Sequence, residues 1–123
     1  MVTLEQFRYC PTHSTPPPFC YDFHYVKPGM VAIFGDNGSG KSTLAQLMAG
    51  WYPDFLPGEI TGTGTLLGTP IGRLPLNEQS ATIQLVQQSP YLQLSGCTFS
   101  VEEEVAFGPE ILCLAEKEIM ARI

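Results

Sequence analysis

The chain has 123 residues, of which 44% are hydrophobic and 15% are charged, and its formal net charge is −6 at pH 7. This length and composition are typical of one globular domain, or of a part of one, and exclude a disordered chain. The acidic excess argues against broad contact with nucleic acid or an anionic membrane surface, because both favour patches of Lys and Arg. The longest apolar runs have five residues, whereas a membrane span needs about twenty. We therefore expect a soluble chain that does not insert into a membrane.

The first third of the chain predicts three strands. Residues 2–9 (VTLEQFRY) are rich in β-forming residues, and residues 19–26 (FCYDFHYV) alternate aromatic with other residues, as a half-buried strand does. Between them lies a segment rich in Pro, Ser and Thr at residues 10–18, where a connecting loop is favoured over a polyproline-recognition motif. The turn Lys27-Pro28-Gly29 leads into residues 30–34 (MVAIF), a continuous apolar run typical of a strand buried on both faces.

The middle of the chain predicts a helix and two further strands. Residues 41–50 carry Leu44, Leu47 and Met48 on one apolar face, and Gly50 suits the end of this helix. Residues 59–67 (EITGTGTLL) and 81–87 (ATIQLVQ) predict the strands.

Two helices are predicted at the C-terminal end. Ser100 is the expected N-cap of a helix at residues 101–107, where glutamates at positions 102–104 would complement the positive end of the helix dipole. A metal-binding cluster is the alternative for these glutamates, but consecutive helical residues point in different directions. Residues 111–123 predict the second helix.

The cysteines are isolated from one another, and the first ten residues lack the basic and apolar regions of a secretory signal. No pair has the Cys-x-x-Cys spacing, and the two histidines do not complete a zinc pattern. We therefore expect free, mostly buried thiols in a reducing cytoplasm, without disulfide or metal roles. The residues concerned are Cys10, Cys20, Cys97, Cys113, His13 and His24.

Residues 35–43 read G-D-N-G-S-G-K-S-T and satisfy the phosphate-loop pattern G-x-x-x-x-G-K-[ST], with a predicted strand before them and a predicted helix after them. Glycines allow successive N–H groups to point at one oxyanion, and the helix adds the positive end of its dipole. Lys41 is expected to reach the β- and γ-phosphates of a nucleotide, and the Ser42 hydroxyl to ligate Mg²⁺. This motif alone does not distinguish kinases, GTPases and transport ATPases.

The residues around the motif resemble the ATP-binding-cassette (ABC) family of ATPases, whose phosphate loop is similar to G-x-N-G-[SA]-G-K-[ST]-[ST]. The resemblance implies that ATP and Mg²⁺ are bound. It also implies that Tyr9, at the end of the first strand, stacks on the adenine ring. The implied nucleotide-binding residues of the loop itself are Asn37, Gly38, Ser39, Gly40, Lys41, Ser42 and Thr43.

A second stretch, V-Q-Q-S-P at residues 86–90, is similar to the Q-loop of the same family. The resemblance implies that Gln88 reaches Mg²⁺ and the attacking water, so that Lys41 and Gln88 are the candidate catalytic residues and Ser42 and Gln88 the candidate metal ligands. Leu94-Ser95-Gly96 superficially resembles the signature loop of the family, but it follows the Q-loop too closely for that role.

The residues from 93 to 110 are similar to the ATPases of cobalt and energy-coupling-factor importers, which carry a T-V-E-E-[DE]-V-A-F-G-P-E stretch. Resemblance to this subfamily implies a transmembrane coupling subunit, a second ATPase subunit and import of a vitamin or of Co²⁺ or Ni²⁺, with the ATPase at the cytoplasmic face of the membrane. The sequence departs from the usual spacing at Ser95-Gly96-Cys97 and at Phe99.

The expected fold is α/β, with a P-loop NTPase core and an antiparallel β-subdomain. We expect a β-subdomain and first core strand at 1–34, the phosphate loop and its helix at 35–50, further strands and the Q-loop at 51–100, and the start of a helical segment at 101–123. The catalytic Asp and Glu, the signature loop and the switch His of the family are not found in the sequence. It is therefore expected to be the N-terminal part of a longer ATPase, with weak nucleotide binding and little hydrolysis of its own.

Four alternatives stay open at this point. They are a non-transport ABC ATPase, a small-molecule P-loop kinase, an interaction module that binds nucleotide for structural reasons, and a nucleotide-binding remnant without hydrolysis. A kinase would transfer phosphate to an acceptor, and a transport ATPase would associate with a membrane protein.

Overall fold

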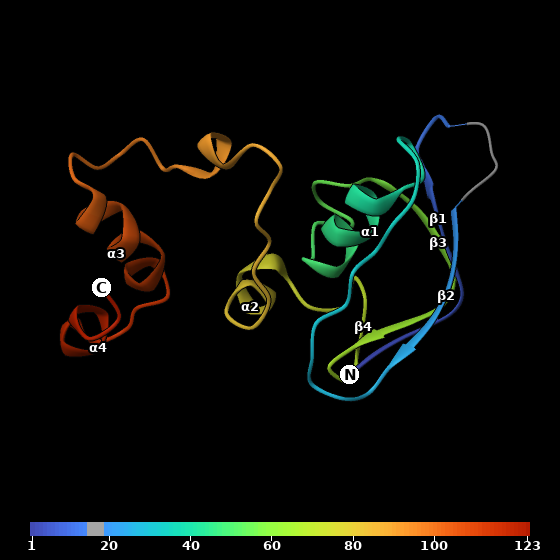
Figure 1. The fold of residues 1–123 in the computed structure, drawn as a ribbon, viewed down its shortest axis with the longest axis horizontal. Helices are drawn as coiled ribbons and strands as arrows, with labels where there is room; N and C mark the ends of the chain where they lie inside the picture. Colours follow the sequence, from blue (N-terminus) through green and yellow to red (C-terminus); the bar gives the residue numbers. More distant parts are fainter. Residues whose placement is uncertain (15–18) are drawn as a thin grey trace. The chain divides into compact units, whose positions relative to one another are not determined.

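The computed structural model describes residues 1–14 and 19–123, which divide into two compact units, Met1–Leu85 and Val86–Ile123 (Figure 1). The predicted connecting loop at residues 10–18 falls partly on residues 15–18, which lie outside the described residues. Its first two residues, Cys10 and Pro11, belong to a strand instead. In the described part of the chain, no helix is long and apolar enough to cross a membrane.

The first unit contains a four-stranded antiparallel sheet. Its strands are β1 (Val2–Pro11), β2 (Phe19–Tyr25), β3 (Gly58–Leu66) and β4 (Thr69–Pro70), in the spatial order β2-β1-β3-β4. The predicted strands at 2–9, 19–26 and 59–67 are therefore confirmed, and so is the antiparallel sheet. The long central strand β1 pairs with both β2 and β3, and its buried residues Leu4, Phe7 and Tyr9 belong to the core cluster.

A bulge interrupts β1 near its middle, where the register with both neighbouring strands shifts between Leu4 and Arg8. Gln6 adopts a positive φ of 46° at this point. The Asp22 carboxylate stabilises the bulge by accepting hydrogen bonds from the Gln6 backbone N–H at 2.7 Å and from its Nε2 at 2.9 Å. Gly62 lies opposite with a φ of 82°, and a Cβ there would come within 2.1 Å of the Gln6 carbonyl oxygen.

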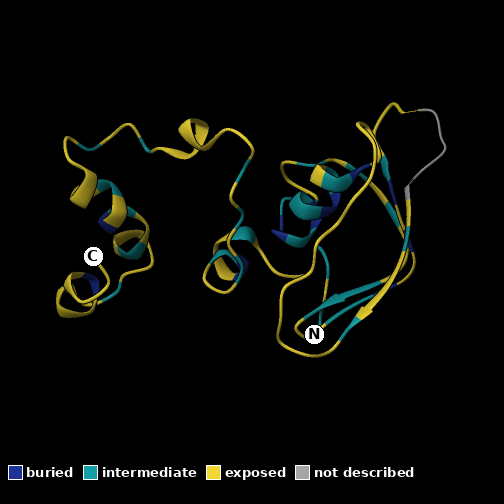
Figure 2. Cartoon of the chain, in the orientation of Figure 1, coloured by how far each residue is buried: buried dark blue, intermediate teal, exposed yellow. Residues whose placement is uncertain are grey.

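One helix of the first unit, α1 (Lys41–Met48), packs on this sheet. Gly40 is its N-cap, and the predicted end at Gly50 is confirmed by a φ of 85°. Figure 2 shows buried residues on α1 and on the strands of the first unit. The core cluster combines residues of β1 and α1: Leu4, Phe7, Tyr9, Leu44 and Leu47. The predicted apolar face of α1 is confirmed, with Met48 half-buried against the cluster.

Two predicted core strands are not strands in this structure. Residues 30–34 run as an unpaired segment, in which Met30 is 98% and Phe34 is 90% exposed. Residues 81–87 begin in the turn after α2 (Leu76–Ser80) and continue without pairing, with Val86 83% exposed. A strand buried on both faces needs a neighbour on each side. No described strand pairs with either segment, so the local apolar pattern alone does not produce a ladder.

The second unit consists of a 3-10 turn, η1 (Pro90–Gln93), and two helices, α3 (Val101–Ile111) and α4 (Glu116–Met120). The predicted cap is confirmed, because Glu103 N donates to Ser100 Oγ at 3.2 Å while the Glu103 side chain accepts from the Ser100 N–H. The predicted continuous helix at 111–123 is wrong. Cys113 adopts a φ of 55°, and its N–H bonds to the Glu110 carbonyl, which ends α3 before α4 begins.

All four cysteines are free, as predicted, but the expectation that they are mostly buried is wrong. Cys10 is half-buried, whereas Cys20, Cys97 and Cys113 are exposed. Cys10 and Cys20 lie near strand ends, Cys97 lies in a loop and Cys113 follows the end of α3, so none belongs to the core cluster.

Candidate functional site

The phosphate loop, residues 35–43, connects the unpaired segment at 30–34 with α1. It closes on itself through a hydrogen bond of 3.2 Å from the Ser39 N–H to the Asp36 carbonyl. Gly38 and Gly40 have φ values of 81° and 86°, a region that L side chains rarely adopt. Gly35 also leaves no room for a side chain, because a Cβ there would lie 2.6 Å from Ser39 Oγ. Steric restrictions on the backbone therefore explain why the motif has glycine at these positions.

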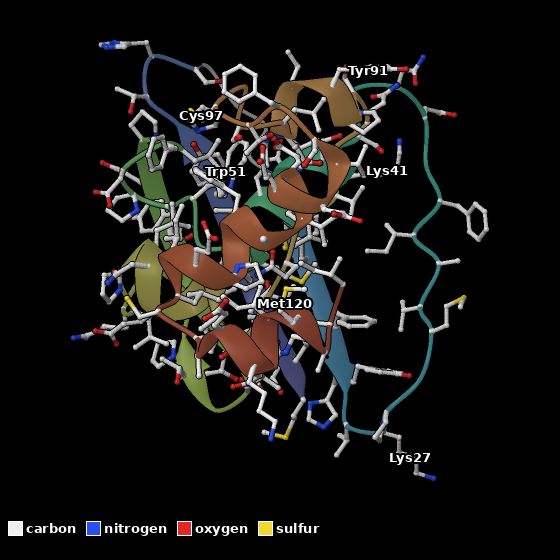
Figure 3. The ribbon with its side chains drawn as sticks, turned by 90° about the vertical axis from the view of Figure 1, so that its left-hand side faces the viewer. Lys27, Lys41, Trp51, Tyr91, Cys97 and Met120 are labelled. Carbon is white, nitrogen blue, oxygen red and sulfur yellow. The ribbon has the colours of Figure 1, made fainter. Side chains whose placement is uncertain are left out.

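Lys41, the first residue of α1, extends its ammonium group back over this loop. Its Nζ donates to the carbonyl oxygens of Gly35 and Asp36, each at 2.7 Å, and to Ser39 Oγ at 3.2 Å. The positive charge is thus held beside the N-terminal end of α1, which carries a partial positive charge of its own. Figure 3 shows Lys41 far from Lys27, at the other end of the connecting segment. The arrangement favours an anion at the loop.

Gly40 is the structural link between the loop and the helix. Its carbonyl accepts two hydrogen bonds, one from the Leu44 N–H at 2.9 Å and one from the hydroxyl of Tyr21 at 3.0 Å. The first starts the helix, and the second comes from strand β2. The motif gives no sign of Tyr21. The only sequence signal for Tyr21 is the aromatic alternation of residues 19–26, which places this residue on one face of the strand.

The predicted nucleotide-binding residues of the loop lie together at one end of α1. Asn37 is exposed in the turn, Ser42 is an exposed residue of the first helical turn, and Thr43 is half-buried beside it. An exposed hydroxyl that follows a lysine at a helix N-terminus fits a hard cation shared with a phosphate oxygen. The residues present therefore fit Mg²⁺ together with a phosphorylated ligand. Their individual roles stay predictions.

Gln88 belongs to the second unit, whereas Ser42 belongs to the first. The glutamine is exposed in the bend before η1, next to Gln87, whose N–H donates to Gln93 Oε1 at 2.8 Å. The joint metal site of Ser42 and Gln88, and the catalytic role of Gln88, stay predictions.

Tyr9, the residue predicted to stack on adenine, lies in the core cluster of the first unit. The side chain is 1% exposed, its ring meets the edge of the Tyr52 ring at 6.3 Å, and its hydroxyl donates to the Pro57 carbonyl at 2.9 Å. Burial raises the pKa of this hydroxyl. In this structure the ring therefore packs in the core of the first unit, and its stacking on adenine stays a prediction. Sequence alone does not distinguish a strand-end tyrosine that packs in the core from one that contacts a nucleotide.

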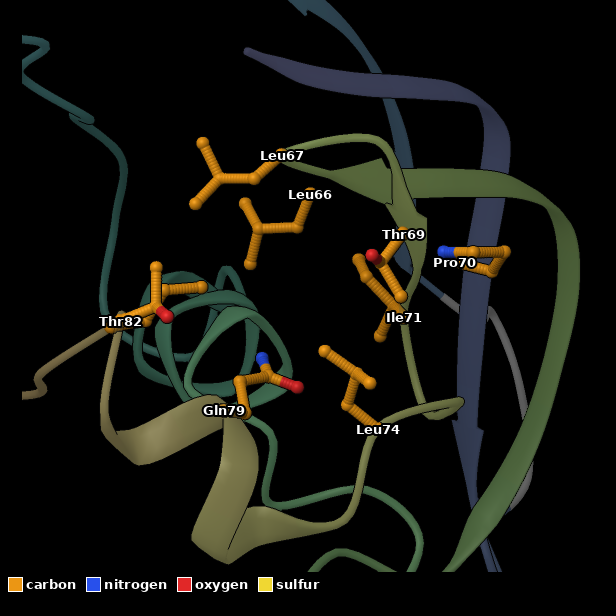
Figure 4. Close-up of a pocket in the computed structure, with 9 residues that line it drawn as sticks. Leu66, Leu67, Thr69, Pro70, Ile71, Leu74, Gln79 and Thr82 are labelled. Atoms are coloured by element: carbon orange, nitrogen blue, oxygen red, sulfur yellow. The ribbon is translucent and has the colours of Figure 1, made fainter. Parts of the chain in front are cut away.

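A cavity of about 220 Å³ lies elsewhere in the first unit, between β4 and α2 (Figure 4). Its lining is mainly aliphatic and contains no residue of the phosphate loop. The labelled residues around it are Leu66, Leu67, Thr69, Pro70, Ile71, Leu74, Gln79 and Thr82. Gln79 is 5% exposed, and its Nε2 donates to the Met48 carbonyl at 2.7 Å, which ties α2 to the end of α1.

A glycine-rich loop closed by a lysine at the start of a helix, beside an antiparallel sheet, defines the chain as a P-loop protein. The family described as ABC transporter matches residues 21–119, and the chain belongs to this family. It is similar to proteins whose names describe them as ABC transporter ATP-binding proteins. One from Methanosarcina mazei is 37% identical over 124 residues, covering 100% of this chain and 43% of the relative. One from Streptomyces coelicolor is 38% identical over 104 residues, covering 83% of this chain and 34% of the relative.

A third relative, from Bacillus cereus, is 35% identical over 120 residues, covering 97% of this chain and 21% of the relative. The chain thus spans less than half the length of the curated relatives that it matches.

Proposed function

We propose that this chain binds ATP through the phosphate loop and forms part of the ATP-hydrolysing subunit of an ABC transporter. The observation that carries this proposal is the position of the Lys41 ammonium, which is held at 2.7 Å from the carbonyls of Gly35 and Asp36 at the N-terminus of α1. The names of the relatives, which describe ATP-binding proteins of transporters, support the same function.

The chemistry of binding follows from the loop. A polyphosphate carries several negative charges, and the loop offers an ammonium group, a helix N-terminus and backbone N–H groups whose direction is set by glycines. The Lys41 Nζ donates to two carbonyl oxygens of the loop, so its ammonium group is already directed toward the loop. Ser42, and Gln88 from the second unit, are the residues that would hold Mg²⁺, which neutralises phosphate charge when bound.

Hydrolysis is proposed for the complete subunit. There Lys41 would stabilise charge on the transferred phosphate, and Gln88 would orient the attacking water. For the 123-residue chain alone we expect nucleotide binding with little phosphate release. Steady phosphate release that disappears in Lys41→Ala would contradict this expectation.

The finer assignment is an importer of the cobalt or energy-coupling-factor type, located on the cytoplasmic face of the membrane. Its support is the residue pattern from 93 to 110, in which the structure shows a capping box at Ser100 and Glu103. The partners would be a transmembrane coupling subunit and a second ATPase subunit, and the cargo a vitamin or Co²⁺ or Ni²⁺. Co-purification with such a coupling subunit in detergent tests this assignment, and its failure beside intact ATP binding favours a non-transport ABC protein.

The central experiment measures ATP affinity of the chain by isothermal titration calorimetry with Mg²⁺, in the wild type, Lys41→Ala and Lys27→Ala. Both variants lose one positive charge, but Lys27 is exposed in the turn after β2, outside the phosphate loop. Loss of the hydrogen bonds from a charged group predicts a fall in affinity of about tenfold or more for Lys41→Ala. Equal affinity in Lys41→Ala and the wild type would reject the proposed site.

A second measurement separates transport ATPase from kinase chemistry. Radiolabelled γ-phosphate is followed in the complete protein, where hydrolysis releases inorganic phosphate. Transfer of the label to a small acceptor would identify a P-loop kinase and reject the proposed reaction.

A further inference from the structure

A tyrosine outside the motif contacts the phosphate loop. Tyr21 lies on β2, nineteen positions before Gly40, and its hydroxyl donates to the Gly40 carbonyl at 3.0 Å. The Tyr21 ring is tilted against that of Phe7, with the ring centroids 6.4 Å apart. Phe7 is fully buried in the core. The hydroxyl therefore reaches the loop from a ring that the core holds in place.

The Gly40 carbonyl is also the first acceptor of α1, because the Leu44 N–H donates to it at 2.9 Å. Two donors thus fix the direction of one carbonyl group. A peptide unit is planar, and in its trans form the C=O and N–H point in opposite directions. Since the carbonyl of Gly40 points into the helix and toward β2, the N–H of Lys41 in the same peptide unit points the other way, toward the loop.

We infer that Tyr21 is a positioning residue for phosphate binding: it fixes the Gly40–Lys41 peptide so that the Lys41 N–H is directed at the bound phosphate. This inference rests on the proposed nucleotide binding at the same loop. Gly40 needs such support because it has a φ of 86° and no side chain that would restrict the peptide. An anion is bound more tightly when its donors are already oriented, because less freedom is lost on binding.

The hydrogen bond from the Tyr21 hydroxyl to the Gly40 carbonyl does not depend on pH in the physiological range. Burial raises the pKa of the Tyr21 hydroxyl above its ordinary value of 10.0. The hydroxyl therefore stays protonated and remains a donor at physiological pH. It supplies its proton to a carbonyl oxygen, which has no proton to donate in return, so the direction of the hydrogen bond is fixed.

The test compares Tyr21→Phe with Tyr25→Phe in the full 123-residue chain. Each variant loses one hydroxyl from β2, at positions four residues apart on the same side of the strand, and each keeps its ring. The Tyr25 hydroxyl lies against Gly29, outside the phosphate loop. Affinity for Mg²⁺–ATP and for tripolyphosphate is measured by calorimetry, with the thermal midpoint recorded for each variant.

We expect Tyr21→Phe to bind both ligands about two- to tenfold more weakly, because the Gly40–Lys41 peptide must then be oriented on binding, a cost no larger than one net hydrogen bond. The factor should be the same for tripolyphosphate as for ATP, because the contact acts on the phosphate side. Tyr25→Phe should bind both like the wild type. A second readout is the ¹³C resonance of the Gly40 carbonyl, which should shift in Tyr21→Phe and stay unchanged in Tyr25→Phe.

The outcomes separate this inference from the proposed function. A wild-type chain that does not bind ATP rejects the proposed function and the inference with it. A wild type that binds, beside a Tyr21→Phe variant of equal affinity, rejects only the role of Tyr21. An equal loss in both tyrosine variants, in step with a lower thermal midpoint, shows a general effect of stability and also rejects that role.

Discussion

The residues before and after Leu85 are stabilised in different ways. Among the described residues, the fully buried side chains belong to the first unit, where Phe7 and Leu47 are 0% and Tyr9 is 1% exposed in a cluster between the sheet and α1. In the second unit the buried side chains are Ala106 and Ile119, and the conspicuous contacts are polar. The helix that follows the phosphate loop thus packs in an apolar core, whereas the start of α3 is stabilised by hydrogen bonds.

This difference shows how much each kind of interaction contributes and how far along the chain it acts. Burying an apolar side chain contributes about 1.5–3 kcal/mol and joins residues far apart in sequence. A capping box contributes less and acts within one helical turn. We therefore expect substitutions in the core to change the stability of the whole first unit, and substitutions at the start of α3 to change that helix alone.

The largest effect is expected from Phe7→Ala. This side chain is fully buried, and its removal should lower the free energy of unfolding of the first unit by about 3–5 kcal/mol. Urea denaturation followed by the fluorescence of Trp51, the single tryptophan, measures the change. Phe34→Ala is the matched control in the same unit, because Phe34 is 90% exposed and should cost about 0.5 kcal/mol or less. Similar losses in the two variants would show that residues 30–34 belong to the core.

The next largest effect is expected from Gly62→Ala, which tests the bulge of β1. The new Cβ would lie 2.1 Å from the Gln6 carbonyl oxygen at a backbone φ of 82°. Strain at such a position costs about 1–3 kcal/mol, and displacement of the neighbouring backbone adds to it, so we expect a loss near the upper limit.

Gly68→Ala separates the two causes in the same denaturation experiment. Gly68 has a φ of 88°, but a Cβ there has nothing within 4 Å. Only the backbone strain remains, at about 1–2 kcal/mol. If Gly68→Ala is as destabilising as Gly62→Ala, the close approach of β1 and β3 contributes nothing.

Sequence predicted the parts of the fold whose causes are local. The β-forming residues of β1, the alternation of β2, the apolar face of α1 and the cap at Ser100 depend on residues a few positions apart, and the structure has these elements. Residues 30–34 were predicted as a buried strand and residues 81–87 as a further strand, but pairing depends on neighbouring strands that no local pattern supplies. The break between α3 and α4 was missed because it depends on the positive φ of Cys113.

The candidate site shows the same division. The phosphate loop was predicted because glycines, lysine and helix start are contiguous, and Lys41 contacts residues five and six positions away. The hydrogen bond from Tyr21 to Gly40 spans nineteen positions and two elements, so the motif could not indicate it. The burial of Tyr9 in the core likewise depends on packing between β1 and α1, which its position along the strand does not show.

A smaller effect is expected from Ser100→Ala at the start of α3. The Ser100 hydroxyl accepts the Glu103 N–H at 3.2 Å, and loss of such a cap costs a helix about 1 kcal/mol. Hydrogen exchange of the amides of α3 should accelerate while the amides of β1 keep their rates. Ser80→Ala is the control, since the Ser80 hydroxyl donates to the Asn77 carbonyl and caps no helix start. Faster exchange in β1 would show that the two units are stabilised together.

The smallest effect is expected from Glu104, whose carboxylate holds the loop before α3. It accepts hydrogen bonds from the Thr98 hydroxyl at 2.6 Å, from the Ser95 hydroxyl at 2.8 Å and from the Ser95 N–H. The hydrogen bond from Thr98, and then those from Ser95, lower the pKa of this carboxyl below its ordinary value of 4.5. The stabilisation is therefore complete above the ordinary value and is lost as the pH falls through the lower pKa of the folded loop.

An NMR titration of the Ser95 amide checks this pH dependence. Its resonance should stay constant from pH 7 to pH 5 and move only at more acidic pH, in step with protonation of the Glu104 carboxyl. In Glu104→Gln a neutral amide replaces the titrating group, so the acid transition of Ser95 should disappear. The control is Glu102→Gln, two residues earlier in the same helical turn, which should retain the transition. A Ser95 transition that persists in Glu104→Gln would show that a group other than the Glu104 carboxyl causes the pH dependence of this loop.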